Sequence, residues 1–182
     1  MLSHTVARIL LFIAIASAGY AQAKAPNVLF LLADDQRPDT IAALGNSTIE
    51  TPNLDALVNR GFTFENAYCM GSTVGAVCNP SRHLIHSGMS LYRYQSAQPK
   101  EGFGAVLRQA VYVTSDQSKR GNTARAWHQE FEHTSYLNDG EVRRSGHHGK
   151  AAADNAISFL EKTWNRDKPL FMYIGFAGPH DP

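Results

Sequence analysis

The apolar residues of this chain fall into short runs separated by stretches with helical spacing. Two runs, residues 27–33 and 170–176, are apolar without alternation, which is typical of parallel strands covered on both faces. Apolar residues spaced three or four apart predict helices at residues 52–60, 80–87, 104–110 and 152–164, and shorter runs predict strands at 62–68 and 111–114. The alternation predicts an α/β fold, a three-layer, mostly parallel sheet flanked by helices.

One long segment breaks this alternation. Residues 115–149 are polar and rich in Gly, His and Arg, with no sustained apolar period. We therefore predict a surface insertion there, more mobile than its surroundings. The strand at 170–176 is expected at a sheet edge, with apolar faces open to solvent.

The first 23 residues differ from the rest of the chain. Arg8 precedes an apolar run at residues 9–16, and Ala21-Gln22-Ala23 follows as a small-residue cleavage signature. This pattern predicts a signal peptide cleaved after Ala23, a secreted or periplasmic protein, and a domain at residues 24–182. A membrane anchor is the alternative, but the run is well below the roughly 20 residues that span a bilayer, and no later segment predicts a membrane span.

Composition narrows the function classes. The chain has 182 residues, a formal net charge of +1, 43% hydrophobic residues and 18% charged residues. These values are typical of a globular protein. The lack of a basic excess argues against a nucleic-acid partner.

Two adjacent carboxylates, Asp34 and Asp35, directly follow the first apolar run. Open α/β sheets bind their ligands at the carboxyl ends of strands. Neighbouring carboxylates repel each other unless a cation lies between them, and calcium or magnesium favours such oxygen ligands. The alternative is a solvated turn without a metal.

The second candidate site is the segment around Cys78. Cys78 lies close to the start of the helix predicted at 80–87, where free N–H groups favour an anion, and Arg82 lies one turn further on. A nucleophile, a helix start and an arginine together indicate a site for transfer of an oxyanion group. A structural disulfide between Cys78 and Cys69 is the alternative, and the residues alone leave both open.

A family resemblance decides between these alternatives. The string Cys78-Asn79-Pro80-Ser81-Arg82, with Gly88 six residues after the arginine, is similar to the sulfatase signature. Further blocks match in the same order, at residues 26–36, 51–55, 64–68, 168–171 and 178–182. Several ordered blocks are far more specific than one motif. The chain resembles the N-terminal portion of the formylglycine-dependent sulfatases of the alkaline-phosphatase-like superfamily.

The resemblance implies residue roles and partners. A maturation enzyme would oxidise Cys78 to formylglycine, which would bind calcium, or magnesium, together with Asp34 and Asp35. Arg82 would steady the aldehyde hydrate, and His180 would contact the sulfate or the leaving oxygen. One hydroxyl of the hydrate would attack sulfur and the alcohol would leave. The remaining hydroxyl would then lose its proton, and the hemiacetal would expel sulfate. The substrate would be a sulfated small molecule or polysaccharide.

The chain also departs from the family pattern. Where the family usually has Gly-Lys-Trp-His, this chain has Ser118-Lys119-Arg120-Gly121, so Lys119 matches the lysine but no histidine follows. Lys119 is a catalytic candidate or an ordinary surface lysine, and His128, after Trp127, is a secondary candidate for the role of the missing histidine.

The chain is also shorter than typical family members. Two alternatives to a sulfatase therefore stay open: a phosphodiesterase or phosphonate hydrolase of the same superfamily, and a catalytically inactive sulfatase fragment. The chain by itself is expected to show little turnover.

Overall fold

The computed structural model describes residues 24–73, 75, 77–96, 101–119, 125–137 and 149–180. The predicted signal peptide at residues 1–23 lies outside these ranges. Within them, no helix combines the length and apolar character needed to cross a bilayer.

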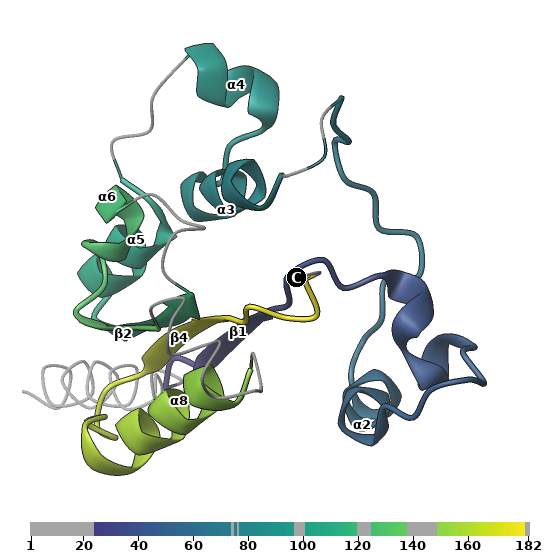
Figure 1. The fold of residues 1–182 in the computed structure, drawn as a ribbon. Coiled ribbons are helices and arrows are strands. Elements are labelled where there is room, and N and C mark those ends of the chain that lie inside the picture. Colours follow the sequence, from purple (N-terminus) through teal and green to yellow (C-terminus); the bar gives the residue numbers. More distant parts are fainter. Residues whose placement is uncertain are drawn as a thin grey trace, which may run out of the picture.

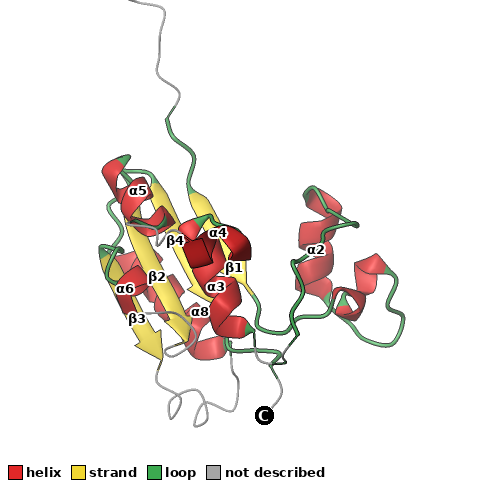
Figure 2. Ribbon diagram, turned by 90° about the horizontal axis from the view of Figure 1, so that it is seen from above, coloured by secondary structure: helices red, strands yellow, loops and turns green. Residues whose placement is uncertain are grey.

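A four-stranded parallel sheet forms the centre of the molecule (Figure 2). Its order is β1-β4-β2-β3, and the strands are β1 (Val28–Leu32), β2 (Val113–Lys119), β3 (His133–Leu137) and β4 (Leu170–Gly175). Since parallel neighbours need crossover connections, at least one helix separates each strand from the next along the chain. The predicted parallel α/β fold is confirmed.

Helices cover both faces of this sheet (Figure 1). On one face lies α8 (Lys150–Lys162), whose Ala152, Ala156 and Phe159 pack in one buried cluster with Met172 and Ile174. The opposite face is covered by α3 (Cys78–Ser87), α5 (Phe103–Gln109) and α6 (Arg125–His128). There the Phe103 ring packs against Phe131 and Phe171 with centroids 5.8 and 5.1 Å apart. The short α4 (Leu91–Ser96) follows α3.

The segment from η1 (Pro38–Thr40) through η2 (Ala42–Leu44) to α2 (Pro52–Arg60) stands beside the sheet (Figures 1 and 2). It is held together locally, because the Thr51 hydroxyl accepts from the Ala42 amide and donates to Asp55, each at 2.8 Å. The following strand predicted at 62–68 is wrong, since these residues are irregular and Phe62 is 83% exposed.

The prediction that the strand at residues 170–176 lies at a sheet edge is wrong. All six residues of β4 are buried, because β4 lies between β1 and β2. In contrast, β1 is an edge strand, and four of its five residues are exposed. An apolar run indicates that a strand is suited to burial, but it does not say which neighbours the strand acquires.

The surface insertion predicted at 115–149 is wrong for the residues that the structure describes. Residues 115–118 form the interior of β2 and are at most 3% exposed, while 133–137 form β3. The polar side chains of β2 are buried because they bond to one another and to neighbouring elements. Asp116 accepts from Ser118 and contacts His128 Nδ1 at 2.5 Å, and Gln117 donates to Ser115 at 2.9 Å. Residues 120–124 and 138–148 lie outside the description.

His86 of α3 is fully buried among aromatic rings. Its imidazole stacks on Phe103 with centroids 4.5 Å apart and meets Tyr173 edge-on at 5.0 Å. Neither ring nitrogen has a hydrogen-bond partner within the described residues. Burial, aided by the positive charge of neighbouring groups, lowers the pKa of His86 to about 3.

We predict that His86 limits the acid stability of the fold. From the ordinary pKa of 6.5 down to about 3, the unfolded chain binds a proton that the folded chain does not, so stability falls as the pH falls. His86→Phe should keep the ring contacts and move acid unfolding to lower pH, as measured by circular dichroism. His133→Gln, at a half-exposed position, is the control, and an unchanged midpoint in His86→Phe would contradict the prediction.

A second prediction concerns the turn before β2. Val111 is 70% exposed and has φ of +66°, a left-handed conformation that is unfavourable for a β-branched residue. Val111→Gly should stabilise the chain by about 0.5–1 kcal/mol, since about 1–2 kcal/mol of strain outweighs the entropy cost of glycine. Urea unfolding measures the difference. Val111→Ala keeps the Cβ atom and should show no comparable gain; equal effects of the two would refute the explanation.

Candidate functional site

The pairing of β1 with β4 continues past the ends of both strands. The Phe176 amide donates to the Leu32 carbonyl at 2.9 Å, and the Asp34 amide donates to the Gly178 carbonyl at 3.1 Å. The chain after β1 therefore runs beside the chain after β4, as Figure 1 shows. This arrangement brings the Asp34–Asp35 pair close to His180, although 145 residues separate Asp35 from His180 in the sequence.

Helix α3 adds the next two side chains. Cys78 is the first residue of the helix rather than the residue before it, and Arg82 follows one turn later on the same face. Arg82 Nη1 donates to Asp34 Oδ1 at 3.3 Å and to the Cys78 carbonyl at 3.2 Å. The ion pair is buried, with Arg82 and Asp34 side chains 4% and 2% exposed. Arg82 thus links the helix that begins with Cys78 to the end of β1.

Three potential ligand atoms converge here. One atom each from Asp34, Cys78 and His180 lie within 4.8 Å of one another. Asp35 completes the group, with Oδ1 accepting from Cys78 Sγ at 3.7 Å and Oδ2 lying 3.5 Å from His180 Nε2. Asp35 has φ of +58°, a conformation that Asp tolerates better than most residues and that is common at functional sites.

The surroundings of Cys78 disfavour its thiolate. Burial, then the hydrogen bond and negative charge of Asp34 and the charge of Asp35, raise the pKa of Cys78 to about 11, although Arg82 opposes the rise. The thiol is therefore protonated at neutral pH. An activated cysteine nucleophile has the opposite environment, with positive neighbours that lower its pKa.

The remaining predicted residues lie in different places. Lys119 is the last residue of β2 and therefore lies at the carboxyl end of the sheet, as Asp34 does. Its side chain lies outside the described atoms. His128 is buried against Asp116 and is not part of the group around Cys78. Cys69 and Cys78 are both free, and Cys69 is exposed, so the structure does not contain the alternative disulfide.

Two buried polar residues of the central sheet, Tyr173 and Asp116, were not predicted from the sequence. Tyr173 lies within the apolar run of β4, and burial raises the pKa of its hydroxyl above the usual range while the charge of Arg82 opposes the rise. Asp116 lies in the polar segment that was interpreted as surface. Neither carries a signal in the sequence, because only strand pairing places Asp116 beside Tyr173.

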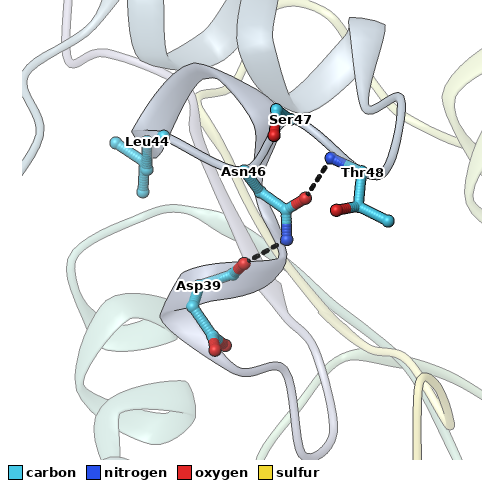
Figure 3. A pocket seen from close by; sticks show the side chains of 6 residues that line it. Asp39, Leu44, Asn46, Ser47 and Thr48 are labelled. Atoms are coloured by element: carbon cyan, nitrogen blue, oxygen red, sulfur yellow. Dashed lines mark hydrogen bonds between the residues drawn. The ribbon is translucent and has the colours of Figure 1, made fainter.

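A separate open hollow of about 330 Å³ lies in the segment before α2 (Figure 3). Asn46 closes a turn on its wall by donating to the Asp39 carbonyl at 2.6 Å and accepting from the Thr48 amide at 2.8 Å. Asp39 is the only carboxylate among the residues that line the hollow, and it pairs with Arg37. No predicted site residue lines this hollow.

Fold and site together define a parallel α/β protein with an acidic, cysteine-containing site at the carboxyl ends of its strands. The sulfatase family model matches residues 26–182. The chain belongs to the sulfatase family.

Characterised relatives agree with this assignment. The chain is 29% identical to an N-acetylglucosamine-6-O-sulfatase of Bacteroides thetaiotaomicron over 187 residues, which is 87% of this chain and 31% of the relative. It is 28% identical to the human N-sulphoglucosamine sulphohydrolase, over 89% of this chain and 33% of that protein. A solved protein in complex with its substrate D-glucosamine-2-N,6-O-disulfate superimposes with a TM-score of 0.70 and 26% identity, over 86% of this chain and 35% of that one. The chain spans about a third of these relatives.

We predict that Arg82 and Asp34 are energetically coupled, because each buried charge is compensated by the other. Arg82→Met leaves the Asp34 carboxylate buried without its cation, which should cost about 3–5 kcal/mol. Adding Asp34→Asn removes that charge and should recover most of the loss. Urea unfolding of the two single variants and the double variant gives the coupling energy. Additive losses would show that the pair does not act as a unit.

Proposed function

We propose that the protein hydrolyses sulfate esters, using a formylglycine formed from Cys78 and a calcium ion held by Asp34 and Asp35. The observation that carries this proposal is the meeting of Cys78, both aspartates, Arg82 and His180 at one edge of the sheet. A phosphodiesterase or phosphonate hydrolase would use similar groups, but the relatives described above are named for sulfate chemistry.

The environment of Cys78 supports its modification. A thiol with a pKa of about 11 beside two carboxylates is a poor nucleophile at neutral pH. An aldehyde hydrate at the same position attacks through a hydroxyl group and needs no thiolate. Cys78 also has Pro80 and Arg82 at the spacing of the Cys-x-Pro-x-Arg string.

The residues present fit a hard divalent cation once Cys78 has been converted. The donors are then carboxylate and hydrate oxygens, which calcium prefers over sulfur. Bound there, the cation would polarise the sulfate group and favour the ionised form of the attacking hydroxyl. Magnesium is a second candidate on the same chemistry.

The chain's own side chains supply positioning and proton transfer. Arg82 bonds to the Cys78 carbonyl and to Asp34, so it holds the nucleophile against the metal-binding carboxylates. Its Nη2 atom has no hydrogen-bond partner within the described residues. His180 Nε2 lies 3.5 Å from Asp35 Oδ2 and would give a proton to the leaving alcohol oxygen as the S–O bond breaks.

The proposed substrate is a sulfated sugar, either a small molecule or part of a polysaccharide. Support comes from the glucosamine-directed names of relatives and from the substrate of the superimposed complex. The predicted signal peptide supports a secreted or periplasmic site of action. Because the chain spans about a third of its relatives, these proposals concern the activity of the whole protein.

The first test is conversion of Cys78. After co-expression with a formylglycine-generating enzyme, peptide mass spectrometry should show the thiol-to-aldehyde mass change on the Cys78 peptide and not on Cys69. Pro80→Ala should reduce conversion because it disrupts the recognised string. Full conversion of Cys69, or none of Cys78 while a control peptide carrying the string is converted, would contradict the proposal.

Activity separates the candidate functions. Any hydrolysis of an aryl sulfate by the converted chain should require calcium and disappear in Cys78→Ala but persist in Cys69→Ser. The rate should be low, because Asp34, Asp35 and the modified Cys78 supply only part of the roughly six to eight oxygens that calcium takes. Faster cleavage of an aryl phosphodiester than of the sulfate would favour the phosphodiesterase alternative.

A further inference from the structure

The donor set of the unmodified chain differs in chemistry from that of the converted one. Before conversion, position 78 carries a thiol, and the converging atoms are a sulfur, an imidazole nitrogen and a carboxylate oxygen. Calcium favours six to eight oxygen ligands and has little affinity for sulfur. The unmodified site therefore does not fit calcium.

This donor set is instead typical of zinc. Zinc binds cysteine sulfur, histidine nitrogen and carboxylate oxygen with tetrahedral geometry, and catalytic zinc sites often use three protein ligands and one water. We propose that the chain, while Cys78 is still a thiol, binds a zinc ion through Asp34, Cys78 and His180. Conversion of Cys78 would then change the metal preference of the site from zinc to calcium.

The geometry requires only small movements. With a Zn–S bond of about 2.3 Å and Zn–N and Zn–O bonds of about 2.0–2.2 Å, tetrahedral ligand atoms lie roughly 3.5 Å apart. The three atoms here lie within 4.8 Å of one another, so they need to close by little more than about an ångström. His180 lies four residues beyond Phe176, whose amide donates to the Leu32 carbonyl, and two beyond Gly178, whose carbonyl accepts from the Asp34 amide. Rotation of the His180 side chain can supply this movement.

Asp35 lies beside two of the three proposed ligands. Its Oδ1 lies 3.7 Å from the sulfur and its Oδ2 lies 3.5 Å from the imidazole, so it borders both ligands. On binding, the Cys78 thiol loses its proton to solvent and a Zn–S bond forms, with no change of oxidation state. Asp34, Asp35 and the Cys78 thiolate carry negative charge, and Arg82 compensates only one of these charges. The net charge of the group is therefore negative, which favours binding of a divalent cation.

The charge of the site does not by itself distinguish zinc from other divalent cations. The sulfur ligand distinguishes zinc from calcium and magnesium, because thiolates bind zinc in preference to those two cations. The inference depends on the geometry of the thiol form and is independent of whether the converted protein hydrolyses sulfate esters.

The test uses the 24–182 chain made without a maturation enzyme, with cobalt as a spectroscopic substitute for zinc. Cobalt should produce a thiolate-to-metal charge-transfer band in the near ultraviolet, and added zinc should abolish it. Cys78→Ser should lose the band and bind zinc more than about 100-fold more weakly. Loss of a residue that only hydrogen-bonds to a metal ligand already lowers metal affinity about 10–100-fold, and Cys78 is itself a ligand. Cys69→Ser is the matched control, since Cys69 is an exposed free thiol outside the group.

Alkylation gives a second readout. Zinc should protect Cys78 from iodoacetamide and leave Cys69 reactive, as peptide mass spectrometry shows, and His180→Gln should weaken this protection. Circular dichroism confirms that each variant is folded. Absence of the cobalt band, its persistence in Cys78→Ser, or its loss in Cys69→Ser alone would overturn the proposal. Calcium binding as tight as zinc binding in the thiol form would also overturn it.

Discussion

The buried ion pair between Arg82 and Asp34 connects the two parts of the molecule that form the site. Asp34 belongs to the end of β1, and Arg82 belongs to the helix that begins with Cys78. Because both side chains are almost fully buried, separating them would leave an uncompensated charge in the interior. The same guanidinium bonds to the Cys78 carbonyl, so one side chain joins the start of α3 to the carboxylate of Asp34.

The sequence predicted features that depend on neighbours along the chain. Apolar runs identified β1 and β4, and helical spacing identified α2, α3, α5 and α8 within a few residues. The positions of Asp34 and Asp35 after β1, and of Cys78 and Arg82 on α3, followed from the same local patterns. Proximity of these residues to His180 was expected only from family resemblance, since it depends on pairing between strands far apart in the sequence.

The errors have a common physical cause. The strand β2 is buried although residues 114–118 are polar, because most of their polar atoms bond to one another or to neighbouring elements, as Asp116 does to His128. A polar segment looks the same in a sequence whether its partners are waters or other side chains. Likewise, β1 is apolar yet lies at an edge, because strand order is set by the crossovers and not by composition.

Helix α3 carries Cys78, Arg82 and His86 at intervals of four residues, so all three lie on the face toward the sheet. One inserted or deleted residue within this helix would rotate everything beyond it by about 100°. Arg82 would then leave Asp34, and His86 would leave its aromatic surroundings, in the same event. During divergence this helix can accept substitutions but not changes of length, so differences in chain length among relatives should accumulate in the loops around it.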